Sequence, residues 1–376
     1  MNKKDQTELK KQFTKKQKCL SRICGCYFDI DGNKKLSYST QFLNLPEEED
    51  QKYMKILSSV VGGRLGRALY NCAYDRNEEM HGDMHKLLLG LRASELKDEG
   101  LLSAFYDRMI EKLPKEGNYL VLLAYGMYDV PTKGDDGFIQ RGESETVYDY
   151  LVCAVCPVNL SDSGLSYNET HNSIESRFRD WIVEMPERGF LFPAFTDRAA
   201  DIHTLMYYAK KPEKLADSFL AETFGLAAPT PEKEEKEGFQ RLLNGVAASM
   251  EEGVELDTVS AVQDELSREI EAHKEDAVPF ELDKKDMKNI LERSGMDVSA
   301  CSEYDELYRE CCGDRSVSAE NIAAGKKMDI RIRDIRISVP RESAGFLETR
   351  VIDGKKCLII TADDDLTVDG VPVDIR

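Results

Sequence analysis

The sequence predicts an α+β fold, with an N-terminal mixed helix and mainly antiparallel sheet domain, a helical middle segment and a small β-rich C-terminal segment. Three observations support this prediction. Apolar residues at helical spacing precede several β-prone runs, without the strict alternation of strands and helices that is typical of doubly wound sheets. A stretch rich in proline and charge, residues 227–237, interrupts the apolar pattern. From residue 326 onward, short β-prone runs with two-residue turns begin again.

These changes divide the chain of 376 residues into five parts. We expect a basic N-terminal arm at 1–22, an α+β core domain at 23–226, a linker at 227–237, a helical region at 238–325 and a β-rich C-terminal region at 326–376. A chain of this length can bury at least one sizeable core. Its 41% apolar and 32% charged residues are typical of a globular protein and not of a disordered one.

Residues 21–29 and 34–39 are predicted to form a β-hairpin around the turn Asp-Ile-Asp-Gly-Asn. The same turn resembles the start of a calcium-binding EF-hand loop. Such a loop needs glycine at its sixth position and glutamate at its twelfth, where this sequence has Lys34 and Thr40. An EF-hand also begins with a helix, whereas the residues before this turn are typical of a strand. We therefore expect a hairpin turn and no calcium site.

Helical spacing of leucines predicts helices at about 47–69 and 81–113, followed by β-prone runs at 118–131 and 147–160. A third run, RFRDWIVEM, is predicted to form a hairpin with GFLFPAF through the turn at 186–189.

In the helical region, Asp283 is expected to cap a helix that Gly295 ends. Further along the chain, Asp353-Gly354 and Asp369-Gly370 have the composition of two-residue hairpin turns.

The ten cysteines are expected to be reduced structural thiols. In a strand, Cys24 and Cys26 point to the same face, whereas Cys153 and Cys156 point to opposite faces. A redox-active Cys-x-x-Cys pair would instead lie at a helix N-terminus. A zinc site that adds Cys19 to these four stays open as an alternative, although no second Cys-x-x-Cys supports it. We predict no bound metal and no cofactor.

His81 and His85 are spaced like the zinc-binding histidines of metalloproteases, but Gly82 stands where the catalytic glutamate would be. We expect two partly exposed histidines on one helix. The glycine-rich segment 62–67 lacks the spacing of a phosphate-binding loop and is predicted to be a turn between helices.

The segment DRAADIH is the strongest catalytic candidate. It brings Asp197, Arg198, Asp201 and His203 just past an apolar strand, where a scaffold can present polar side chains. An aspartate there can orient His203 as a general base, and Arg198 can hold an anion, as in a hydrolase-like enzyme. The structural alternative is an aspartate N-cap and an Asp–Arg pair at the start of a helix from Asp201. The sequence favours the structural alternative.

The net charge is −19, yet cations are concentrated in two segments. Residues 1–22 hold eight Lys or Arg against two acids, and residues 326–341 hold six against two. We expect the first segment to be a solvated arm. In the second, Arg331 and Arg333 alternate with isoleucines, which predicts a strand with one basic and one buried face.

These basic patches can contact RNA or a ribosome through phosphates without reading bases. Arg177 and Arg179 flank aromatic residues that can stack on bases, although we expect Phe178 and Trp181 to pack inside the protein. Residues 283–311 have a helix-turn-helix outline, but their second helix is acidic, so no sequence-specific DNA binding is expected.

No apolar run approaches the roughly 18–20 residues that a membrane-spanning helix needs, and the N-terminus lacks the apolar core of a secretory signal. We therefore expect a cytoplasmic protein without membrane contact.

Several segments together resemble domain-of-unknown-function family 4317, which comprises bacterial proteins common in Gram-positive anaerobes. They are SRICGCY, GNYLVLLAYGMYDVP, CPVNLSDSGLSYN, RDWIVEMPERGFLFPAFTDRAADIH and LETRVIDGKKCLII. The resemblance covers nearly the whole chain. It implies a cytosolic bacterial origin and brings with it no established activity, cofactor or catalytic residue.

Each catalytic motif considered above lacks a residue that its chemistry requires, or has a structural explanation. We therefore expect a non-enzymatic binding or regulatory protein. Two alternatives are a protein that associates weakly with RNA or ribosomes through its two basic patches, and a hydrolase-like enzyme with its site in the DRAADIH segment.

Overall fold

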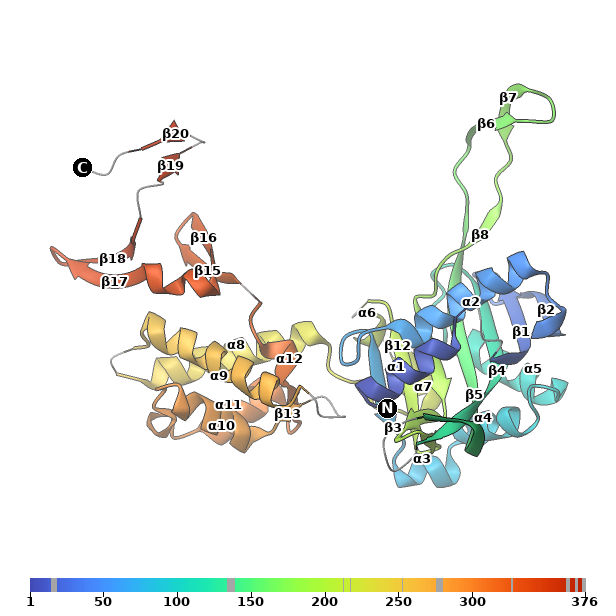
Figure 1. Ribbon diagram of the computed structural model, residues 1–376, viewed down its shortest axis with the longest axis horizontal. Helices are drawn as coiled ribbons and strands as arrows, with labels where there is room; N and C mark the ends of the chain where they lie inside the picture. The colour runs from blue at the N-terminus through green and yellow to red at the C-terminus, as the bar shows by residue number, and fades with distance from the viewer. Residues whose placement is uncertain are drawn as a thin grey trace. The chain divides into compact units, whose positions relative to one another are not determined.

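A computed structural model describes residues 1–14, 19–133, 139–211, 213–216, 218–251, 253–274, 280–325, 327–362, 366–368 and 371–373 (Figure 1). The chain divides into two units, of which the first comprises Met1–Lys233 and the second begins at Glu234. The α+β prediction is confirmed. The first unit combines helices with an antiparallel sheet, and the second combines a helical cluster with short hairpins.

An antiparallel sheet organises the first unit. Its strand order is β2-β1-β4-β5-β9-β12-β3, and β8 also pairs with β5. The strands are β1 (Leu20–Phe28), β2 (Lys34–Gln41), β3 (Leu69–Ala73), β4 (Asn118–Lys133), β5 (Ile139–Leu160), β8 (Trp181–Val183), β9 (Arg188–Phe192) and β12 (Thr204–Ala209). The strand β3 is thus an edge strand of the sheet. It pairs with β12, which comes much later in the chain.

Both faces of this sheet are buried. Successive strand residues point to opposite faces, and β4 is apolar at nearly every position. Its Val121 and Leu123 belong to one core, and its Leu120 and Leu122 belong to the other. A strand that is apolar on both sides has to be covered on both sides.

Helices supply this cover. The first core contains residues of α4 (Asp83–Ala93), α5 (Glu99–Lys112) and α7 (Phe219–Phe224), and the second contains residues of α1 (Lys3–Gln12) and α2 (Glu47–Gly62). The shorter elements of this unit are η1 (Phe42–Asn44), α3 (Arg76–His81) and α6 (Glu213–Ala216).

The first residues form a helix of the core and not the expected solvated arm. Asn2 caps α1, because its side chain accepts the backbone N–H groups of Lys4 and Asp5. Leu9 is 0% exposed, and Phe13 lies in the same core. The exposed lysines of α1 lie on the opposite side of the helix. The number of cations alone therefore predicted a solvated arm, although the helix also has an apolar stripe.

A buried polar contact also fixes α1 to α2. The Gln6 side-chain amide donates to the carbonyl oxygens of Val61 (2.9 Å) and Gly63 (2.6 Å), at the end of α2. These two carbonyls would otherwise lack helical partners. Of the remaining cations of the expected arm, Arg22 lies in β1, and Lys15, Lys16 and Lys18 lie outside the described residues.

The predicted hairpin of β1 and β2 is confirmed. Asp29 stabilises its turn, because one carboxylate oxygen accepts the backbone N–H groups of Asp31 (3.1 Å) and Asn33 (2.8 Å). Hydrogen bonds from Lys35 and from the Asn33 backbone hold the pKa of the Asp29 carboxyl well below its usual range. The turn is therefore explained by its own hydrogen bonds.

Two predicted connections differ in the structure. The helix α2 ends at Gly62 and Leu69 begins β3, so the glycine-rich segment joins a helix to a strand. The strands β8 and β9 do not pair with each other as the expected hairpin. Both pair with β5, at Val158–Leu160 and at Leu151–Val155. The segment 186–189 therefore separates β8 from β9, and both strands pair with different parts of β5.

The chain between β5 and β8 forms a separate antiparallel ribbon of β6 (Gly164–Asn168) and β7 (Ser173–Arg177), which projects from the sheet (Figure 1). The expectation that the aromatic residues after β7 pack inside the protein is wrong. Phe178 is 88% exposed and Trp181 is 56% exposed.

In the second unit, helices pack around one apolar core. They are α8 (Glu232–Ser249), α9 (Leu256–Ala272), α10 (Lys284–Arg293), η2 (Val298–Ala300), α11 (Tyr304–Cys312) and α12 (Ala319–Ile322). The predicted cap is confirmed, since the Asp283 side chain accepts the N–H groups of Lys285 and Asp286. Gly295 follows the end of α10 with φ of +89°, a conformation that suits glycine.

Short β elements accompany these helices. They are β13 (Glu281–Leu282), β14 (Val317–Ser318), β15 (Lys327–Ile332), β16 (Ile335–Pro340), β17 (Leu347–Ile352), β18 (Lys355–Ile360), β19 (Thr367–Val368) and β20 (Val371–Pro372). A short 3-10 helix, η3 (Arg341–Phe346), lies between β16 and β17. The turn between β17 and β18 is confirmed, with positive φ at Asp353 and Gly354. The predicted turn at Asp369-Gly370 lies outside the described residues.

Candidate functional site

Asp197 and Arg198 form the turn of a small hairpin. It joins β10 (Ala194–Thr196) to β11 (Ala199–Asp201), and the φ values of the two turn residues are +49° and +62°. Such left-handed pairs match the twist of a hairpin. Asp201 therefore ends a strand, and the expected helix from this residue is wrong, because pairing with β10 organises the segment.

Arg198 and Asp197 connect this hairpin to α1. The Arg198 guanidinium donates to both carboxylate oxygens of Glu8 at 3.0–3.2 Å and to the carbonyl oxygen of Pro131 at 2.6 Å. The backbone N–H of Asp197 donates to Asp5 at 3.1 Å. With side chains only 18% and 23% exposed, the Arg198–Glu8 pair has the geometry of a structural clamp.

His203 contacts a carboxylate that sequence reasoning missed. Its Nδ1 lies 2.7 Å from Oε1 of Glu79 in α3, and its side chain is 66% exposed. The Asp201 carboxylate accepts a hydrogen bond from the backbone N–H of His203 at 3.1 Å, whereas the imidazole of His203 contacts Glu79. The structure therefore brings His203 to a carboxylate and turns Arg198 towards α1. Catalysis by Asp197, Arg198, Asp201 and His203 stays a prediction.

The two zinc-spaced histidines are separated by a break between helices. His81 ends α3, whereas His85 lies in α4 and is only 4% exposed. The His85 ring packs between Tyr74 and Phe192, and its Nε2 lies 2.9 Å from the carbonyl oxygen of Ile202. The expectation of two partly exposed histidines on one helix is wrong, because this face of α4 packs on the sheet.

The cysteines of the sheet lie on the faces that strand geometry predicts. Cys24, Cys26 and Cys153 belong to one core, and Cys19 and Cys156 belong to the other. Burial raises the pKa of the Cys156 thiol to about 12, so the reactive thiolate is disfavoured at neutral pH. Among the described residues, no cluster of three or more His, Cys, Asp or Glu is arranged to hold a metal ion.

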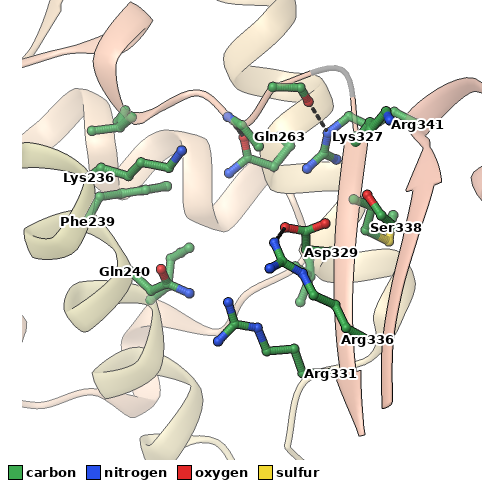
Figure 2. Close-up of a pocket in the computed structure, with 16 residues that line it drawn as sticks. Lys236, Phe239, Gln240, Gln263, Lys327, Asp329, Arg331, Arg336, Ser338 and Arg341 are labelled. Carbon is green, nitrogen blue, oxygen red and sulfur yellow. Dashed lines mark hydrogen bonds and ion pairs between the residues drawn. The ribbon is translucent and has the colours of Figure 1, made fainter. Parts of the chain in front are cut away.

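A basic groove of about 1050 Å³ lies in the second unit, between the helices α8 and α9 and the hairpin β15–β16 (Figure 2). Its charged lining consists of five cationic side chains and one carboxylate. These are Lys236, Lys327, Arg331, Arg336, Arg341 and Asp329. We take this basic groove as the candidate functional site, because it concentrates positive charge in a chain whose net charge is −19.

The register of the hairpin explains which side chains line the basic groove. Arg331 lies directly opposite Arg336, and Asp329 lies opposite Ser338, so these four share one face. The predicted basic face of this strand is therefore confirmed. The other face is less buried than expected, since Ile332 is 41% exposed. Arg333, which was expected on the basic face, occupies the turn instead, with φ of +53°.

Most of these cations are available to a ligand. Arg336 donates to Asp329 at 2.7 Å, and Arg341 donates to the carbonyl oxygen of Gly325 at 3.1 Å, as Figure 2 shows. Among the described residues, Lys236, Lys327 and Arg331 form no hydrogen bond or ion pair within the groove. The hydrogen bond from Arg336 and a second from Ser338 hold the pKa of the Asp329 carboxyl below its usual range.

The helical wall adds polar and apolar contacts. Lys236, Gln240 and the apolar Leu243 come from α8, and the apolar Val259 comes from α9. Gln263 of α9 accepts the backbone N–H of Ala324 at 2.6 Å and so fixes the segment that leads into β15. Sequence reasoning identified the cations of the hairpin and missed Lys236, because no local pattern relates α8 to a strand so far along the chain. Lys326, part of the predicted basic segment, lies outside the described residues.

No helix in the described ranges has both the length and the apolar character that a membrane crossing needs. Comparison of the sequence with family profiles gives a match over residues 1–371, described as a domain of unknown function (DUF4317). No match is found among curated proteins.

Proposed function

The chain belongs to the family DUF4317, and we propose that it is a cytosolic, non-enzymatic binding protein whose basic groove holds an RNA strand by its phosphates. The observation that carries this proposal is the convergence of five cations on one groove, of which one comes from α8, three from the hairpin β15–β16 and one from η3. A groove of this kind binds phosphates because each Lys or Arg that contacts a phosphate releases condensed counterions from the nucleic acid.

The shape of the basic groove favours a strand over a small ligand. Its volume of about 1050 Å³ is slightly above the range for small-molecule pockets, about 300–1000 Å³. The lining aromatic residue, Phe239, is only 3% exposed and so offers no stacking surface to a base. Contact with the backbone alone gives binding without sequence preference.

The test measures the affinity of the full chain for a fluorescent single-stranded RNA over a series of salt concentrations. The double substitution Lys236→Ala and Arg331→Ala should weaken binding by at least about tenfold, because two charge-assisted contacts are lost. Each phosphate contact adds about 0.7 to the slope of log affinity against log salt for single strands, so the slope should fall by about 1.4. Co-sedimentation with ribosomes at low salt provides a second measurement.

Arg268→Ala is the matched control. Arg268 is an exposed cation of α9 that pairs with Glu265 outside the groove lining, so its removal should leave the slope unchanged. Equal losses in the control and in the double variant would show a general charge effect and refute the assignment of the groove. Binding of tripolyphosphate with an affinity equal to that of RNA would indicate a small phosphate ligand instead.

Substitution of Asp329 provides a second test, in which RNA binding is expected to become tighter. Because Asp329 neutralises Arg336, the substitution Asp329→Asn should release this guanidinium to a phosphate. We expect tighter RNA binding and a salt slope steeper by about 0.7, measured as above. Weaker or unchanged binding by this variant would mean that Arg336 does not face the ligand.

A further inference from the structure

The ribbon of β6 and β7, here called the arm, has one apolar and one polar face. Tyr167 lies directly opposite Ile174, and Leu165 shares their face because it is two residues from Tyr167 in the same strand. These three side chains are 58%, 64% and 75% exposed, in the order named. The arm therefore presents a continuous apolar surface to solvent.

The other face of the arm is polar and satisfied within itself. Glu175 accepts hydrogen bonds from Asn168 at 3.0 Å and from Ser173 at 2.6 Å. These contacts, with a third from His171, hold the pKa of the Glu175 carboxyl below its usual value. The polar side chains of this face therefore find hydrogen-bond partners within the arm, whereas the apolar side chains of the opposite face are exposed to solvent.

The arm also lacks neighbours along its edges. In the described part of the chain, β6 pairs with β7 and with no further strand. A two-stranded ribbon is only marginally stable in water, and an unpaired strand edge is a template for another strand.

We propose that the arms of two copies of this chain pair through their β6 edges, antiparallel and centred on Ser166. The charge pattern selects both the partner and the edge. The strand β6 contains no charged residue, so its pairing with a second β6 opposes no like charges. Pairing of β7 with a second β7 about its centre would place Glu175 against Glu175, which is unfavourable.

This register also brings the apolar side chains together. With Ser166 opposite Ser166, Leu165 of one copy lies beside Tyr167 of the other, and the reverse contact follows from the two-fold symmetry. The result is a four-stranded sheet in which one face carries Leu165, Tyr167 and Ile174 from both copies. An interface of this small size gives a weak dimer.

Sedimentation of the full chain tests the pairing. At a chain concentration in the high micromolar range, the measured mass should exceed the 42.6 kDa of one chain and approach twice that value. Ser166 also faces Glu175 within its own arm, so Ser166→Lys and Ser166→Glu are each combined with Glu175→Gln. Each double variant then places like charges directly opposite each other across the pair, and each should raise the dissociation constant by about fivefold. An equimolar mixture of the two variants should recover association, because opposite charges then face each other.

Ser176→Lys is the matched control. Ser176 lies on β7, opposite Leu165, and therefore away from the edge that pairs. This variant should associate like the original chain. A monomeric original chain at this concentration, or variants at Ser166 that associate as well as the control, would overturn the proposal. Failure of this test would leave the RNA-binding proposal untouched, since the arm belongs to the first unit and the basic groove to the second.

Discussion

Replacing Leu9 with alanine is expected to lower the free energy of unfolding of the first unit by about 2–5 kcal/mol. Leu9 is 0% exposed and belongs to the core that α1 and α2 share with the sheet. The substitution removes buried methyl groups and leaves a cavity, because the backbone of the sheet cannot collapse to fill it. Denaturant unfolding followed by the fluorescence of tyrosine measures the loss.

Lys11→Ala is the control on the same helix. Lys11 is exposed, so its substitution should change the free energy of unfolding by no more than about 0.5 kcal/mol. A small and equal effect of both substitutions would contradict the packing of α1 and would support a solvated arm. Deletion of the first 18 residues, which would test RNA contacts of a free arm, should instead destabilise the whole first unit.

Gly189→Val is expected to be still more damaging, with a loss above about 4 kcal/mol or no folded protein. A Cβ atom at this position would lie 2.3 Å from the carbonyl oxygen of Cys153 and 2.9 Å from a methyl group of Val60. The first contact is with the backbone of the adjacent strand β5, which cannot move without breaking its pairing with β9. Glycine is required here because the backbone of β5 and the Val60 side chain of α2 both lie too close to admit a larger residue.

Gly117→Ala provides the comparison. Nothing lies within 4 Å of a Cβ atom at Gly117, which precedes β4. This substitution should therefore leave the thermal unfolding temperature nearly unchanged, whereas Gly189→Val should lower it or abolish the transition. A stable, folded Gly189→Val variant would show that β9 does not lie beneath α2.

Local chemistry in the sequence predicted the elements whose cause is local. The Asp29 turn, the Asp283 cap and the turn at Asp353-Gly354 were recognisable because their hydrogen bonds join residues that are neighbours in the chain. The strand faces of Cys153 and Cys156 followed from the alternation of side chains alone. The turn composition at 186–189 was misleading for the same reason. Local composition predicts a turn, but it does not show with which strand β8 and β9, on either side of that turn, will pair.

The candidate sites depended on contacts between distant parts of the chain. The partners Glu79 for His203 and Glu8 for Arg198 come from α3 and α1, so no spacing in the sequence identifies them. Lys236 reaches the basic groove from α8 for the same reason. One missed element did have a signal. Leu9 and Phe13 are four residues apart, a helical spacing that predicts a buried stripe even among many lysines.

The position of β3 in the sheet constrains how the protein is made. The strand begins at Leu69, but its neighbour β12 begins only at Thr204. At typical rates of synthesis, roughly 5–20 residues per second, β3 emerges from the ribosome on the order of ten seconds before its partner. Throughout this interval its apolar residues and its open edge are exposed to other nascent chains. The sheet of the first unit is therefore completed only after β12 has been translated, and until then α2, which precedes β3 and packs against it, is the element that can cover these residues.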